Sequence, residues 1–69
     1  MIRATINGRE VELGAEVTVL EHLTSLGVHP QAVAVEINGE IVPRDGYEST
    51  AIRDRDVVEI VRMVGGGAD

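Results

Sequence analysis

Two Asn-Gly dipeptides, each preceded by alternating apolar and polar residues, constrain the fold of this chain more than any other feature. Asn7-Gly8 follows the alternating residues 2–6, and Asn38-Gly39 follows the alternating residues 33–37. Asn and Gly both tolerate positive φ angles, which the two central positions of a type I′ hairpin turn require. The sequence therefore predicts two β-hairpins, one around each dipeptide.

A short helix is predicted between the two hairpins. Thr18-Val19-Leu20-Glu21 fits a capping box, in which the Thr18 hydroxyl and the Glu21 carboxylate satisfy free backbone amides. We expect the helix to begin near Val19 and to end at Gly27, a natural left-handed terminator. Its apolar stripe is expected to contain Val19, Leu20, Leu23 and Leu26.

The second half of the chain is predicted to complete the sheet. Pro43 lacks an amide proton, so it ends the second hairpin or places that strand at a sheet edge. Residues 44–56 are expected to form a connecting loop with one short helical turn. Residues 57–63 are the most β-prone stretch and are predicted to form the last strand. Residues 64–69 include three consecutive glycines and have little to bury, so we expect a mobile tail.

Size and charge narrow the class of protein. The chain has 69 residues, no cysteine and one aromatic residue, Tyr47, so we expect one domain with an aliphatic core. We assign residues 1–63 to this domain and residues 64–69 to the tail. Twelve acidic against six basic residues give a formal net charge of −6, which opposes nucleic-acid binding. No apolar run approaches the length of a membrane span, and the cytoplasm is the default location.

The polar residues give little support for an enzyme, a metal site or a bound cofactor. No serine lies in a nucleophile-elbow pattern. We expect the two imidazoles, His22 and His29, to face solvent. Solvated strand edges and turns explain the acidic residues better than a ligand cluster or an acid–base pair does. These acidic residues are Glu10, Glu12, Glu16, Asp54 and Asp56.

The glycine-rich end is the remaining candidate functional segment. A frayed terminus is the simplest explanation for it. However, this segment directly follows the last predicted strand, and glycines without Cβ atoms let a backbone enter a narrow channel. Residues 64–67 span at most about 13 Å when extended, at ~3.3 Å per residue. Such a tail is suited to enter a partner's catalytic site while the folded domain docks outside.

The predicted order ββαββ resembles the β-grasp, or ubiquitin-like, arrangement. This is an α+β fold in which a mixed sheet carries one helix across one face, and the resemblance implies that the last strand lies between the two hairpins. Three segments, residues 38–44 (Asn-Gly-Glu-Ile-Val-Pro-Arg), 54–61 and 64–67, further resemble the ThiS-type sulfur-carrier proteins of thiamine biosynthesis. The family often has Asp-Gly-Asp where this chain has Asp54-Arg55-Asp56.

The resemblance implies a sulfur carrier and not an enzyme. A ThiF-like partner would use ATP to adenylate the carboxylate of a terminal glycine, which corresponds to Gly67 here, and Gly65 and Gly66 would complete the tail. A persulfide enzyme would then supply sulfur to form a thiocarboxylate, and thiazole synthase would use that sulfur. The molybdopterin, cysteine and tRNA-thiolation pathways are alternative recipients. A ubiquitin-like protein modifier and a non-covalent interaction module are alternatives of other classes.

The chain departs from the family pattern because it continues through Ala68-Asp69. The reactive carboxylate at Gly67 therefore requires removal of this dipeptide, and we expect a processing peptidase to perform it. The alternatives are an inactive form of the carrier and extra residues that are foreign to the natural chain.

Partner docking is expected on the sheet face opposite the helix. If Val58 and Ile60 point toward the helix, the alternate residues of the last strand point outward. The predicted partner-binding residues are Val61, Met63 and Ala34. The alternative is that Val61 and Met63 complete the core.

Overall fold

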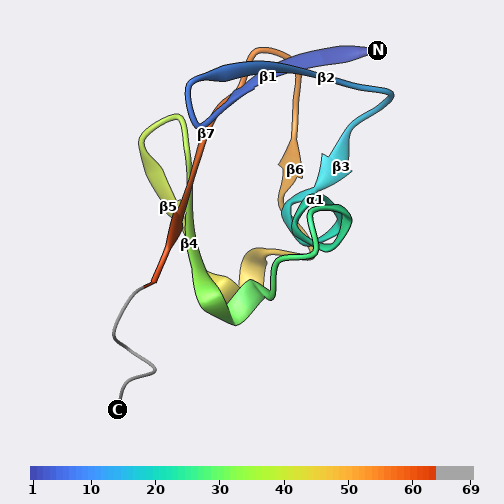
Figure 1. Cartoon of the computed structure of the whole chain (residues 1–69). Coiled ribbons are helices and arrows are strands. Elements are labelled where there is room, and N and C mark those ends of the chain that lie inside the picture. Colours follow the sequence, from blue (N-terminus) through green and yellow to red (C-terminus); the bar gives the residue numbers. More distant parts are fainter. Residues whose placement is uncertain (64–69) are drawn as a thin grey trace.

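A five-stranded mixed sheet and one α-helix form the two layers of the described part of the chain, residues 1–63 of this computed structural model (Figure 1). The sheet has the order β2-β1-β7-β4-β5. Its strands are β1 (Ile2–Ile6), β2 (Arg9–Leu13), β4 (Val33–Ile37), β5 (Glu40–Val42) and β7 (Val57–Arg62). β7 pairs in parallel with β1 and antiparallel with β4. The predicted mixed sheet with one helix and the central position of the last strand are confirmed, but three sheet strands follow the helix, so the order is ββαβββ and not the predicted ββαββ.

Both predicted hairpin turns are present. Asn7 and Gly8 have φ angles of 52° and 81°, and Asn38 and Gly39 have φ angles of 54° and 85°. Only the two turn residues separate the last pair of each hairpin, Ile6 with Arg9 and Ile37 with Glu40. These are the positive φ angles that a type I′ turn requires, and they fix the register of both hairpins.

The helix α1 (Val19–Ser25) begins where the capping box predicts. The Glu21 N–H donates to Thr18 Oγ1 at 3.0 Å, and the Thr18 N–H donates to Glu21 Oε1 at 2.8 Å. Gly27 follows the helix with a φ angle of 72°, as expected for a left-handed terminator. In Figure 1 the helix lies across from the sheet, and buried side chains of the helix, such as Leu23, belong to the same core cluster as Val35 and Val58 of the sheet.

Two expectations for this helix were wrong. His22 is buried, with 8% of its surface exposed, whereas Leu26 is 54% exposed. The helix has only seven residues, and Leu26 is its C-cap, so it lies past the last turn. The positions that face the sheet are Val19, His22 and Leu23, which follow the i, i+3, i+4 spacing of one helical face. His29 is exposed, as predicted.

The predicted loop of residues 44–56 contains more structure than expected. The short helical turn is present as η2 (Arg44–Gly46). The loop also holds a strand that was not predicted, β6 (Ala51–Ile52), which pairs with β3 (Val17–Thr18) ahead of the helix. A second helical turn, η1 (Pro30–Ala32), leads into β4. Two-residue strands are too short to produce an alternating pattern in the sequence.

The core is aliphatic, as expected, except for one aromatic side chain. Tyr47 is only 3% exposed, and its hydroxyl donates to the Val33 carbonyl at 3.2 Å. The other buried apolar residues are Ala4, Ile6, Val19, Leu23, Val33, Val35, Val42, Ile52 and Val58. Within residues 1–63, no helix is long and apolar enough to cross a membrane. That same range contains no group of three or more potential metal-binding side chains.

Candidate functional site

The end of β7 is the point from which the candidate tail leaves the folded domain. The Met63 N–H donates to the Ala32 carbonyl at 2.8 Å, which extends the pairing with β4 to the last described residue. The predicted tail, residues 64–69, lies outside the described residues, and with it the site residues Gly65, Gly66 and Gly67 and the dipeptide Ala68-Asp69. The root of the tail is thus held by a backbone hydrogen bond to Ala32, the residue that immediately precedes β4.

Both hairpin turns also hold β7 through asparagine side chains. Asn7 Oδ1 accepts a hydrogen bond from the Ile60 N–H at 2.7 Å, and Asn7 Nδ2 donates to the Ile60 carbonyl at 3.2 Å. On the other side, Asn38 Oδ1 accepts from the Val57 N–H at 2.9 Å. The side-chain amide of Asn7 thus continues the pairing of β1 with β7 past the end of β1. The strand that carries the tail is fixed from both neighbouring hairpins.

The outward face of β7 has the alternation that the sequence predicts. Val58 is fully buried, whereas Val61 and Met63 are 57% and 50% exposed. Ala34 lies directly opposite Val61 on β4 and is partly buried. The alternative that Val61 and Met63 complete the core is therefore wrong. The three predicted docking residues lie together at the end of the sheet from which the tail departs.

One apolar residue of this face was missed in the sequence. Ile41 on β5 is 73% exposed and lies directly opposite Glu36, an outward-facing residue of β4. The two-residue turn at Asn38-Gly39 already determines this pairing, because it sets Ile37 opposite Glu40 and hence Glu36 opposite Ile41. The outward direction of Ile41 could therefore have been predicted from the hairpin register. We call Ala34, Ile41, Val57, Val61 and Met63 the outer apolar face.

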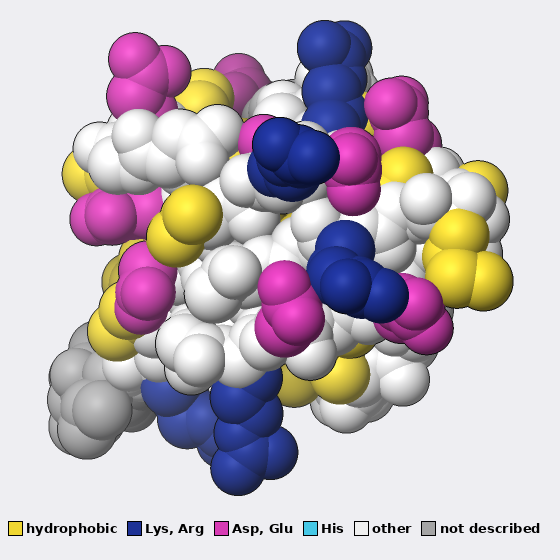
Figure 2. Space-filling model, turned by 90° about the horizontal axis from the view of Figure 1, so that it is seen from above, with side chains coloured by type: hydrophobic (Ala, Val, Ile, Leu, Met, Phe, Trp, Pro, Cys, Tyr) yellow, Lys and Arg dark blue, Asp and Glu magenta, His cyan; other side chains and the backbone are white. Residues whose placement is uncertain are grey.

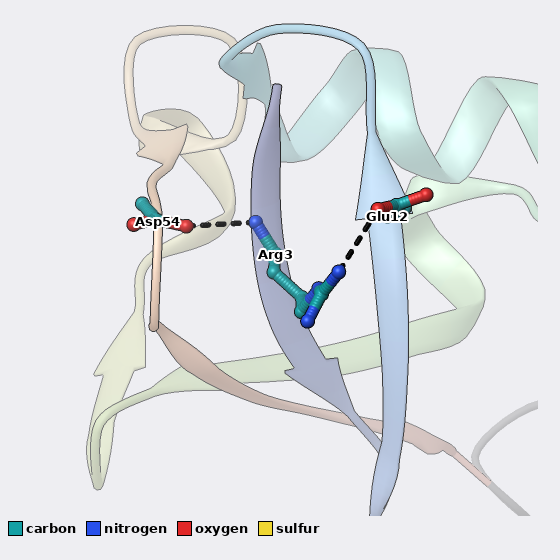
Figure 3. A network of polar contacts seen from close by, with 3 residues as sticks. All are labelled: Arg3, Glu12 and Asp54. Carbon is teal, nitrogen blue, oxygen red and sulfur yellow. Dashed lines mark hydrogen bonds and ion pairs between the residues drawn. The ribbon is translucent and has the colours of Figure 1, made fainter.

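The acidic residues near the first hairpin are structural. Figure 3 shows Arg3 of β1 between Asp54 and Glu12. The Arg3 N–H donates to Asp54 Oδ1 at 2.8 Å, and Arg3 Nη2 lies 3.1 Å from Glu12 Oε2. The hydrogen bond that the Arg3 guanidinium donates to Glu12, followed by the nearby charge of Glu10, raises the pKa of Arg3. These exposed contacts agree with a solvated strand edge.

Asp54 and Asp56 belong to a turn, as the sequence predicts. Asp56 Oδ1 accepts from Asn38 Nδ2 at 3.0 Å, and its Oδ2 accepts from the Arg53 N–H at 2.8 Å. Both oxygens of this carboxylate therefore accept hydrogen bonds that hold the turn and the second hairpin in place. On the face seen from above in Figure 2, acidic and basic side chains are intermixed, and the visible hydrophobic side chains form only small groups.

The fold is the β-grasp of ubiquitin-like proteins, and a crystal structure of a thiamine biosynthesis protein (ThiS) from Geobacter metallireducens matches it with a TM-score of 0.83. The identity is 36%, and the match covers 96% of this chain and 100% of that protein. The model of the ThiS family matches residues 2–67. The chain belongs to the ThiS family.

Two relatives of this chain have names that state a function. The sulfur carrier protein ThiS of Bacillus subtilis is 38% identical over 63 residues, which cover 90% of this chain and 96% of that protein. A thiazole synthase from Paramagnetospirillum magneticum is 46% identical over 68 residues, or 99% of this chain. The matching region is only 21% of that enzyme, so this chain spans about a fifth of its length. In that relative, a ThiS-like segment and a thiazole synthase share one polypeptide.

Proposed function

We propose that this protein carries sulfur as a thiocarboxylate on Gly67 and donates it for thiazole formation in thiamine biosynthesis. The observation that carries the proposal is the ThiS family match over residues 2–67, which ends at the glycine assigned as the reactive terminus. The protein acts as a carrier in the cytoplasm, and the catalytic groups belong to its partners. A β-grasp domain whose last strand is held on both sides provides a rigid body that can dock to a partner and present such a tail.

The chemistry requires activation because a carboxylate is a poor electrophile. One oxygen of the Gly67 carboxylate attacks the α-phosphorus of ATP in a ThiF-like enzyme, and pyrophosphate leaves. The terminal sulfur of a protein persulfide then attacks the acyl carbon, and AMP leaves. A thiol reduces the resulting acyl disulfide to the thiocarboxylate, forming a disulfide from that thiol and the donor sulfur. A chain without cysteine can transport sulfur in this way.

A processing step precedes activation. The carboxylate of Gly67 is tied up in a peptide bond until Ala68 and Asp69 are removed. The family match supports this step because it stops before the dipeptide. A peptidase that accepts small residues at an exposed chain end would perform it.

Docking uses the outer apolar face, with Val61, Met63 and Ala34 as its central residues. These three residues lie beside the root of the tail, so a partner that covers them also receives the tail. Exposed apolar groups of this kind favour protein interfaces. The activating enzyme and thiazole synthase are the proposed partners. The shared polypeptide of the Paramagnetospirillum relative supports the second of these partners.

Reconstitution tests the function. Chains ending at Gly67, at Asp69 and at Gly65 are each incubated with ATP, a ThiF-like enzyme and a persulfide donor, and intact mass is measured. We expect only the chain that ends at Gly67 to exchange one oxygen for sulfur. Absence of exchange in that chain, while a known ThiS protein is loaded in parallel, contradicts the proposal. Covalent adducts on other proteins would instead indicate a modifier.

A charge substitution tests the docking face. Met63→Asp is expected to weaken binding to the activating enzyme by at least tenfold, because it places a charge in an apolar contact. Leu26→Asp is the matched control, since Leu26 is 54% exposed but lies at the end of the helix. Equal affinities of the two variants, measured by titration calorimetry, would reject this assignment.

A further inference from the structure

The Arg44 guanidinium ties together the segments that meet at the root of the tail. Arg44 Nε donates to the Pro30 carbonyl at 3.3 Å, and Nη2 donates to the Val33 carbonyl at 3.1 Å. Nη2 also lies 3.7 Å from Met63 Sδ. Arg44 belongs to η2, so one side chain links η2, the start of β4 and the last described residue of the chain.

The local backbone explains why a side chain is needed there. Ala32 and Met63 form a hydrogen-bonded pair, so the carbonyl of the next residue, Val33, points away from β7. Strand β5 ends at Val42, and the chain turns into η2 at Arg44, the residue that would lie opposite Val33 if the strand continued. The Val33 carbonyl therefore accepts hydrogen bonds from the Arg44 guanidinium and the Tyr47 hydroxyl, and not from the backbone of a neighbouring strand.

We infer that Arg44 is a positioning residue for Met63, which it fixes relative to the start of β4 and thereby fixes the point from which the proposed sulfur-carrying tail continues. This inference rests on the proposed sulfur-carrier function. A planar guanidinium donates along several fixed directions at once, whereas a lysine ammonium acts as a single flexible point charge. Holding both Met63 and the start of β4 keeps the end of the described chain in one position relative to the proposed docking face, and such fixed positioning favours the productive encounter with a partner's active site.

The neighbouring Arg62 supplies a matched control. It lies directly opposite Val33 across β4 and β7, and it is exposed like Arg44. Its side chain forms no hydrogen bond within residues 1–63. Arg44→Gln and Arg62→Gln thus remove the same charge close to the tail, but only the first removes contacts with the Val33 carbonyl and Met63 Sδ.

The first measurement does not depend on activity. Amide hydrogen exchange at the Met63 N–H, in the chain ending at Gly67, is expected to accelerate at least threefold in Arg44→Gln and to stay near the wild-type rate in Arg62→Gln. Arg44→Lys should lie between them. Equal exchange rates in all four proteins would overturn the inference even if the protein proves to be a sulfur carrier.

The second measurement is adenylation by the activating enzyme, followed as pyrophosphate release. Arg44→Gln is expected to lower kcat about tenfold, an effect comparable to ordering the backbone of one further residue. Its KM should stay within twofold because the outer apolar face is intact, and Arg44→Lys should recover part of the rate. An unchanged kcat, or an equal loss in Arg62→Gln, would overturn the inference. Failure of the wild-type chain would instead reject the proposed function.

Discussion

Glu36 lies directly opposite Glu59 across β4 and β7, and both carboxylates face away from the helix. The alternation of hydrogen-bonded pairs along this ladder makes the two residues a hydrogen-bonded pair. Neither carboxylate forms an ion pair within residues 1–63. Like charges in this position oppose each other without compensation from the fold. The repulsion lies within the surface that we propose for docking.

Neutralising either member of this pair should stabilise the protein. Glu36→Gln is expected to raise the free energy of unfolding by roughly 0.5 kcal/mol at low salt, and less at high salt. Glu40→Gln is the matched control, because Glu40 is opposite the apolar Ile37. Urea unfolding at two salt concentrations measures the effect. No gain beyond that of the control would show that the pair is not repulsive.

The Asn7 amide should contribute measurably to stability. Asn7→Gly keeps a residue that accepts the positive φ angle but loses both hydrogen bonds to Ile60. We expect a loss of about 1–2 kcal/mol, from two bonds of ~1 kcal/mol each, partly offset by solvation of the exposed groups. Asn7→Asp retains the acceptor alone and should lose the donor contact. If urea unfolding gives Asn7→Gly the wild-type stability, the amide does not hold β7.

Much of the fold could be predicted because its signals are local. The Asn-Gly turns fixed the hairpins, and Thr18 with Glu21 fixed the start of the helix. The β3–β6 pair has two residues in each strand, so no periodicity marks it. The burial of His22 depends on which helical face meets the sheet, and residue type favoured Leu26 for that position.

The candidate site, like the fold, could be predicted from the sequence only where the signals are local. The outward direction of Val61 and Met63 follows from strand alternation, and the exposure of Ile41 follows from hairpin register. The contacts of Arg44 join residues that are far apart in the chain, so no local sequence pattern predicts them. The residue was visible only as the last member of the Asn-Gly-Glu-Ile-Val-Pro-Arg segment. Its partners depend on how β5 ends beside β4.

Arg55 occupies a backbone position that favours glycine. Its φ angle is 71°, in the left-handed region, at the centre of the turn Asp54-Arg55-Asp56. Arg55→Gly is therefore expected to raise the free energy of unfolding by roughly 0.5 kcal/mol, after the larger entropy of glycine in the unfolded chain is deducted. Arg55→Ala keeps the Cβ atom and should give no such gain, which separates the backbone effect from the exposed contact with Asp54. A destabilised Arg55→Gly protein would contradict this reading.

Burial of His22 should make stability depend on pH. Desolvation lowers the pKa of His22 below the 6.5 of an unperturbed imidazole. Below pH ~6.5 the unfolded chain binds a proton more readily than the folded chain, so the free energy of unfolding falls as the pH drops. Above that pH this contribution is constant.

Unfolding in urea between pH 7.5 and 5.5 measures this slope. His22→Gln should flatten it in that range, whatever the change in absolute stability. Identical slopes for the wild type and His22→Gln would mean that the burial of His22 does not affect its titration.

The most direct test of the sulfur-carrier account is the intact mass of the protein purified from its native cells under non-oxidising conditions. We predict a chain that ends at Gly67, of which a fraction has one carboxylate oxygen replaced by sulfur. Sulfur found only on chains that retain Asp69, or a fully processed chain that never carries sulfur while thiamine is being made, would contradict it.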